Sequence, residues 1–357
     1  MRYLILIAGV FVAILAYTVF WFHVKAEVEG NVAAWAANQQ AAGDTVKYAS
    51  IDIAGYPFRI EATVSKPVFG HVAPARDWTI QGETLRVIAA PWNVRHIVAY
   101  HEGPFEIHYG LAQPDGRRRV IELSGTTDAA GASAVWKGRK WDHADLELSK
   151  LSLTARGARV PLTAGHLEFH VRLLQPGAPD GSGGIDQPGQ SEYAVEASDV
   201  SFPGATDEPF GKVMQTFNTV LEVHGDKPFG LSIPKIEAWR DAGGTVDVKT
   251  FALDWGPLQV SVAGSLALDE ANRPTGALTA KFTNYNALID ALGGATKSGQ
   301  DPGLKRLLNS LTQASGQPQG TLTLPFSMQD GTLYLGPVAV ADVPPILDVP
   351  AKAPAAN

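Results

Sequence analysis

The sequence predicts a mainly β protein of the α+β class. An N-terminal transmembrane helix is expected to precede one or more long, curved antiparallel β-sheets with a few short covering helices. Three observations predict this fold. Residues 3–22 carry no charged side chain. Charged residues make up only 18% of the chain, whereas glycine (36 residues) and proline (24 residues) are frequent. Many short segments alternate between apolar and polar residues, and up to residue 174 no amphipathic helix of a dozen residues lies between them.

Residues 3–22 are predicted to cross a membrane, within a signal-anchor at residues 1–24. At about 1.5 Å per helical residue, this run spans about 30 Å, the hydrocarbon thickness of a bilayer. Its far end gathers aromatic residues, as an interfacial belt does: Tyr17, Phe20, Trp21 and Phe22. The alternative is a cleaved secretory signal, whose apolar core is normally shorter, about 7–15 residues.

The location of the rest of the chain follows from the charges around this run. Arg2 and the free amino terminus precede it, which indicates an N-terminus in the cytoplasm and places the chain after Lys25 on the other side of the membrane. The expected location is therefore the bacterial inner membrane, with a single pass and most of the chain in the periplasm. The absence of cysteine is compatible with that oxidising compartment. A net charge of −7 argues against nucleic acid as a partner.

Residues 25–42 are predicted to form a juxtamembrane helix, because Val28, Val32 and Trp35 share one helical face. Gly43 and Asp44 end it, and a first β region covers residues 43–174. Its clearest alternation puts Phe58, Ile60, Ala62 and Val64 on one strand face. The expected strands are 46–53, 58–64, 78–89, 94–101, 105–109, 119–124, 144–154 and 166–174. Residues 175–190 have no apolar periodicity and are predicted to be a flexible loop or a linker.

A second β region is predicted over residues 191–345. Its strands are expected at 192–202, 213–223, 258–268, 278–282, 321–328 and 332–335, with a short helix at 236–241. The strand 258–268 alternates throughout and would measure about 36 Å at about 3.3 Å per residue. Two further helices are predicted at 285–292 and 302–313 from their caps and apolar stripes. Residues 346–357 are expected to be a loose tail.

No catalytic motif is present, which predicts a non-enzymatic protein without a cofactor. There is no G-x-S-x-G elbow, no P-loop and no G-x-G-x-x-G, and the chain has no cysteine for a thiol nucleophile or a thiolate metal site. His166, Glu168 and His170 would share one face of a strand. The two histidines would then be about 13 Å apart at about 3.3 Å per residue. That is too far for one metal with ligands at about 2.1 Å, so no metal site is predicted.

Several motifs resemble an uncharacterised bacterial family known only as a domain of unknown function, number twenty-one twenty-five. They are Gly55-Tyr56-Pro57-Phe58-Arg59, Trp239-Arg240-Asp241-Ala242-Gly243-Gly244, Trp255-Gly256-Pro257-Leu258, Leu268-Asp269 with Arg273-Pro274-x-Gly276, and Leu335-Gly336-Pro337. More distantly, the hairpin that contains Leu268-Asp269 and Arg273-Pro274 is similar to pieces of AsmA-like proteins. This second resemblance implies a membrane-anchored periplasmic β structure whose apolar groove handles lipid. The chain is too short to bridge an envelope alone.

The apolar face of a long sheet must be covered by other parts of the protein or be occupied by a ligand. We therefore predict a protein that binds or handles membrane lipid of the inner membrane in an apolar β groove. The candidate groove residues are Phe58, Ile60, Val64, Leu258, Val260, Val262, Leu266, Leu278, Phe282, Leu322 and Leu324. Two alternatives stay open: the face is an ordinary filled core, or the protein is a structural or assembly factor that docks cell-envelope proteins through its sheet edges.

Overall fold

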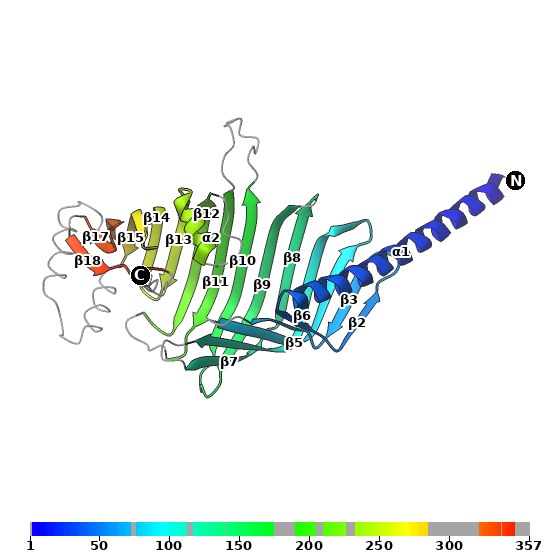
Figure 1. Ribbon diagram of the computed structural model, residues 1–357, viewed down its shortest axis with the longest axis horizontal. Coiled ribbons are helices and arrows are strands. Elements are labelled where there is room, and N and C mark those ends of the chain that lie inside the picture. The colour runs from blue at the N-terminus through cyan, green and yellow to red at the C-terminus, as the bar shows by residue number, and fades with distance from the viewer. Residues whose placement is uncertain are drawn as a thin grey trace, which may run out of the picture. The chain divides into compact units, whose positions relative to one another are not determined.

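The computed structural model describes residues 2–72, 76–112, 117–138, 140–174, 190–204, 210–225, 233–284, 321–336 and 338–346. It confirms a mainly β fold with one long N-terminal helix, antiparallel strands and few helices (Figure 1). The chain divides into two units, residues 1–163 and residues 164–357. The predicted helices at 285–292 and 302–313, the predicted loop at 175–190 up to residue 189 and the end of the tail lie outside the described residues, while Gln190 begins a strand.

The first unit contains one helix and nine strands among its described residues. They are α1 (Arg2–Ala41), β1 (Asp44–Lys47), β2 (Ser50–Ala54), β3 (Ile60–Ser65), β4 (Val68–Val72), β5 (Arg76–Ala90), β6 (Asn93–Ala112), β7 (Arg118–Thr126), β8 (Ala129–Lys137) and β9 (Lys140–Ala155). The second unit contains β10 (Leu162–Leu174), β11 (Gln190–Ser201), β12 (Val213–His224), α2 (Ile233–Asp241), β13 (Thr245–Trp255), β14 (Leu258–Leu268), β15 (Pro274–Thr283), β16 (Thr321–Gln329), β17 (Thr332–Leu335) and β18 (Val338–Asp342).

The predicted signal-anchor and juxtamembrane helix form one continuous helix, α1, of 40 residues. At about 1.5 Å per residue, α1 is about 60 Å long. Gly43 ends it as predicted, with a left-handed φ of 91° that favours glycine directly after a helix. Side chains in the first half are largely exposed, whereas Trp21, Val24 and Ala36 in the second half are buried. The first half therefore extends beyond the strands of its own unit (Figure 1).

Two long strands, β5 and β6, organise the sheet of the first unit. The first half of β5 pairs with β4 and its second half with β3. In the same way, β6 pairs first with β8 and then with β7, and β9 pairs with both β7 and β8. A register shift between Gly82 and Thr84 marks the change of partner in β5. Such a bulge bends the strands, which gives this sheet its curvature.

The predicted strands 94–101 and 105–109 are both parts of β6. Gly103 and Pro104 therefore lie inside a strand. They occupy the point where β6 passes from β8 to β7, since β8 pairs with residues up to His101 and β7 with residues from Phe105. A proline without an N–H is tolerated there, because no ladder hydrogen bond is lost.

From β11 to β18 the second unit is an antiparallel meander in which each described strand pairs with the next in the chain. The predicted strand 258–268 is confirmed with the same bounds as β14. Helix α2 extends the predicted helix 236–241 by three residues at its start. Trp239 of α2 is buried, and its indole donates a hydrogen bond to the carbonyl of His224 at 2.8 Å.

Helix α1 forms the core of the first unit together with β2 and β3. Trp21 and Val24 of α1 pack with Ile53, Ile60 and Ala62, and all five side chains are buried. Val28, Ile51 and Val87 flank this cluster. The second half of α1 is therefore part of the folded unit.

Candidate functional site

One face of the second unit is apolar across seven strands, from β11 to β17. Strand register aligns side chains in rows that cross the sheet. The middle row contains Tyr193, Leu221, Val248, Gly264, Leu278, Phe326 and Leu335. The rows on either side continue it with Val195, Thr219, Phe251, Val262, Ala280 and Leu324, and with Val223, Val246, Leu266, Gly276 and Met328. We call this surface the apolar face.

A bulge in β13 keeps the apolar face continuous. The register shifts between Val248 and Phe251, so that Val248 pairs with Gly264 and Phe251 pairs with Val262. Side chains normally alternate between faces, and three positions would put these two residues on opposite sides. Two residues, Lys249 and Thr250, lie between them on β13 where β14 has only one, and this one extra residue turns Val248 and Phe251 onto the same side.

The opposite face of the same strands is polar. One of its rows contains Glu192, Glu222, Asp247 and Ser265, and another contains Glu196, Asn218, Ala252, Ser261 and Lys281. The sheet formed by these strands thus has one apolar face and one polar face.

Burial differs along the apolar face. Leu258, Ala280, Leu322 and Leu324 are buried, at 2–5% exposure. The middle row is only partly buried at Tyr193, Leu221, Val248, Leu278 and Phe326. The face is therefore a filled core near β14 and β16 and is more accessible along its middle row.

The structure places the predicted groove residues in both units. Eight of them lie on the apolar face of the second unit: Leu258, Val260, Val262, Leu266, Leu278, Phe282, Leu322 and Leu324. In the first unit, Ile60 lies in the core under α1, and Val64 lies further along β3. Phe58 precedes β3, in the turn after β2, where 76% of it is exposed.

The polar face carries a network of hydrogen bonds around Asp247. Asp247 accepts hydrogen bonds from the hydroxyl of Ser265 at 2.7 Å and from the ring of His224 at 3.0 Å. Glu222 lies 3.8 Å from His224 and 3.0 Å from Lys249. The Ser265 hydrogen bond, helped by His224, lowers the pKa of Asp247 from its usual value. Ligand atoms of Glu222, His224 and Asp247 could hold a cation, but each already has a partner in the protein.

The predicted strand around His166 and His170 is β10. The two imidazoles do not meet at one point, because the carboxylate of Glu168 lies between them. It is 2.5 Å from Nε2 of His166 and 2.9 Å from Nε2 of His170. These two hydrogen bonds lower the pKa of Glu168 below its usual value. The cluster stabilises a negative charge at Glu168.

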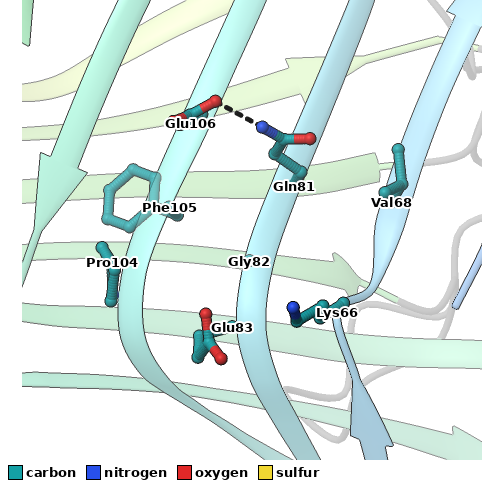
Figure 2. Close-up of a pocket in the computed structure, with 8 residues that line it drawn as sticks. All are labelled: Lys66, Val68, Gln81, Gly82, Glu83, Pro104, Phe105 and Glu106. Atoms are coloured by element: carbon teal, nitrogen blue, oxygen red, sulfur yellow. Dashed lines mark hydrogen bonds between the residues drawn. The ribbon is translucent and has the colours of Figure 1, made fainter. Parts of the chain in front are cut away.

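A shallow pocket of about 250 Å³ lies in the first unit where β5 changes its partner (Figure 2). Lys66, Glu83, Glu106, Gln81 and Phe105 contribute to its lining, and Gln81 donates a hydrogen bond to Glu106. Ligand sites are usually larger, about 300–1,000 Å³, and mostly apolar. The small volume and the charged lining make this pocket a weaker candidate than the apolar face.

The turn after β2 holds helix α1 through its backbone and its rings. The indole of Trp21 donates to the carbonyl of Arg59 at 3.1 Å, and the ring of Tyr56 lies edge-on to Trp21, with 5.5 Å between centroids. Gly55 closes the turn by accepting the amide of Arg59 at 3.1 Å. A Cβ at Gly55 would lie 2.7 Å from the Arg59 carbonyl oxygen. This turn is the first of the motifs behind the family resemblance.

The other motifs hold together the ends of strands in the second unit. The ring of Trp239 lies on Gly244, where a Cβ would come within 2.2 Å of it. Asp269 accepts the amides of Ala271 and Arg273, each at 2.9 Å, and so closes the turn between β14 and β15. Gly256 donates its amide to the side chain of Gln215 at 2.7 Å. The contacts of these residues are structural.

A model of one protein family matches residues 21–344, which is most of the chain. Its description reads "Uncharacterized protein conserved in bacteria (DUF2125)". The chain belongs to this family. The match begins at Trp21, the first residue of α1 in the core of the first unit.

No curated protein and no solved structure matches this member of the DUF2125 family. The distant similarity to AsmA-like proteins is not among these findings, and it stays a prediction. Family membership confirms the resemblance in the structural motifs.

Proposed function

We propose that this protein is anchored in the bacterial inner membrane by α1, with most of the chain in the periplasm, and that it binds membrane lipid without catalysing a reaction. The observation that carries the proposal is the apolar face of the second unit, which spans seven strands and whose middle row is only partly buried from β11 to β16. A partly accessible apolar surface of this length suits an acyl chain.

The anchor supports a lipid as the ligand. Helix α1 is long and apolar enough to cross a membrane, by length and composition. A protein held at the bilayer meets acyl chains at a high local concentration, so that even a modest affinity for a single chain is useful. The polar face, with Glu222, Asp247 and Lys281, keeps the other side of the sheet in water.

Two neighbouring residues of β15 allow a matched test of acyl-chain binding. Leu278 lies on the apolar face and Thr279 on the opposite one, where it is exposed. A chain that starts at residue 20, which retains Trp21, is purified and titrated with a fluorescent fatty acid. We expect Leu278→Gln to weaken binding about tenfold, equivalent to about 1.4 kcal/mol, and Thr279→Gln to leave it unchanged.

The folded state of both variants is checked by circular dichroism, and lipids extracted from the wild type are identified by mass spectrometry. Absence of extracted lipid together with absence of probe binding would overturn the proposal. Equal binding by the two variants would show that the probe does not use the apolar face.

A second candidate function is the docking of envelope proteins at a sheet edge. β18 is exposed at all five residues, and it pairs with β17 along one side. An exposed edge strand can pair with a strand of another chain. Recovery of a stoichiometric protein partner that is lost with Val340→Pro, while acyl-probe binding persists, would favour this function.

A further inference from the structure

We propose that one edge of the first unit docks into the headgroup layer of the bilayer that α1 spans. This edge consists of the turn Gly55–Arg59 between β2 and β3 and the turn around Trp92 between β5 and β6; we call it the membrane edge. The inference rests on the proposed anchoring by α1, and it adds a second, peripheral contact with phospholipid.

The direction of α1 relative to β2 places the turn Gly55–Arg59 on the membrane side. Three hydrogen bonds run in order along the helix. Trp21 donates to Arg59 in the turn, Lys25 donates to Ile53 in β2 at 2.9 Å, and Gln40 donates to Val46 in β1 at 2.7 Å. The N-terminal part of α1 therefore lies beside the turn and its C-terminal part beside β1. The apolar run, most of which precedes Trp21, leaves the first unit on the side of the turn.

The turn also reaches past the end of the apolar run. The hydroxyl of Thr18 lies 2.7 Å from that of Tyr56, and Tyr17 donates a hydrogen bond to the carbonyl of Pro57. Thr18 precedes Phe22 by four residues, or about 6 Å along the helix axis. If residues 3–22 fill the hydrocarbon layer, Tyr56 and Pro57 lie at or below the headgroups.

Strand register brings Trp92 to the same level. Ile60 at the start of β3 pairs with Ala89 near the end of β5. Phe58 lies two residues before Ile60, and Trp92 lies three residues after Ala89, so both turns project from the same edge of the sheet. Phe58 is 76% exposed and Trp92 is 66% exposed. Large exposed aromatic side chains beside a membrane span are typical of the interfacial belt.

The charges at the membrane edge suit phosphate groups. Arg59 is 57% exposed although it pairs with Glu61 at 2.8 Å, and Arg95 is exposed at the start of β6. Within the part of the chain that the structure describes, Arg95 has no carboxylate partner. At the end of β8, Lys137 pairs with Asp142 at 2.9 Å. Glu61 and Asp142 are thus each paired with a cation, and Arg95 remains to attract anionic headgroups.

The test uses the full-length chain in vesicles of equal parts phosphatidylcholine and phosphatidylglycerol. Because the chain contains no cysteine, a single introduced cysteine gives one unique fluorescent label. The four variants are Phe11→Cys in the span, Phe58→Cys and Asn93→Cys at the membrane edge, and Val120→Cys as the control. Val120 is exposed and pairs with Gly110, near the far end of β6. Spin labels on the lipid headgroup or near the end of the acyl chain quench the fluorophores according to depth.

We expect the headgroup spin label to remove most of the fluorescence at positions 58 and 93 and none at position 120, while the acyl-chain label quenches position 11. Quenching at position 11, with positions 58 and 93 behaving as position 120 does, would overturn the docking and leave the anchor intact. An unquenched position 11 would overturn the anchor and the docking together.

Discussion

Removal of the Trp21 side chain should destabilise the first unit more than any neighbouring change in α1. Trp21 is 3% exposed, packs on Ile60 and Ala62, and donates a hydrogen bond to Arg59. Truncation of a buried tryptophan to alanine costs about 3–5 kcal/mol. Since Trp21 would remain in the bilayer interface when the strands unfold, the lower end of about 3 kcal/mol applies. For a unit of this size, about 2–4 °C is lost per kcal/mol, so Trp21→Ala should lower the melting temperature by about 6–12 °C.

The assay is thermal unfolding of the full-length protein in lipid nanodiscs, followed by far-ultraviolet circular dichroism. Phe20→Ala is the matched control, because Phe20 lies beside Trp21 on α1 and is 42% exposed. It should change the melting temperature by less than about 2 °C, which corresponds to about 0.5 kcal/mol. Equal shifts for the two variants would refute the conclusion that α1 belongs to the core of the first unit.

Three further predictions concern the turns. Gly55→Ala should lower the free energy of unfolding of the first unit by about 1–3 kcal/mol, because the new Cβ would lie 2.7 Å from a backbone oxygen. Gly43→Ala, also at positive φ but with open space around its Cβ, should lower it less. Urea unfolding measures both. Gly244→Ala should destabilise the second unit by about 1–3 kcal/mol by overpacking, since its Cβ would overlap the Trp239 ring, whereas Gly243→Ala meets no atom and carries only the strain of its positive φ; full retention of stability in Gly244→Ala would contradict this packing. Burial raises the pKa of Asp269, but hydrogen bonds from Arg273 and Ala271 outweigh it and lower the pKa below its usual value. The stabilisation by Asp269 is present above pH 3.8, its unperturbed pKa, and is lost as the pH falls through the lowered one. Urea unfolding from pH 7 into strong acid should therefore show a smaller acid loss in Asp269→Asn than in the wild type.

Alternation of apolar and polar residues predicted the strands that pair without interruption. β14 is the clearest case, because its alternation and its register both continue over the whole strand. Strand β13 was missed because its bulge at Lys249 and Thr250 breaks the two-residue period. Strand β8 was missed because it is built largely of alanine, glycine and serine, which carry little apolar pattern.

The predicted strand 58–64 began too early. Gly55 and Arg59 close the turn through their backbone, so Phe58 belongs to the turn and β3 begins at Ile60. Tyr56 was noted only as part of a family motif and Trp92 was not noted, because an exposed aromatic residue beside a turn has no periodic signature. Only the pairing of Ile60 with Ala89 brings the two turns to the same edge.

For single strands of the second unit, the sequence predicts which side is apolar. It does not predict how these sides align into rows across the sheet. The alternation of β14 and β15 puts Val262 and Ala280 on apolar sides, yet their alignment with Phe251 and Leu324 depends on register. Register is set by turn geometry and bulges, which the sequence pattern alone does not specify.

The most direct test of lipid binding compares the two faces of β14 in living bacteria. A photoreactive benzoylphenylalanine replaces either Val262, on the apolar face, or Ser261, which is exposed on the polar face. After irradiation the full-length protein is purified and its mass is measured. We predict lipid adducts at position 262 and none at position 261. Protein adducts alone at position 262, or equal lipid adducts at both positions, would contradict a lipid-binding apolar face.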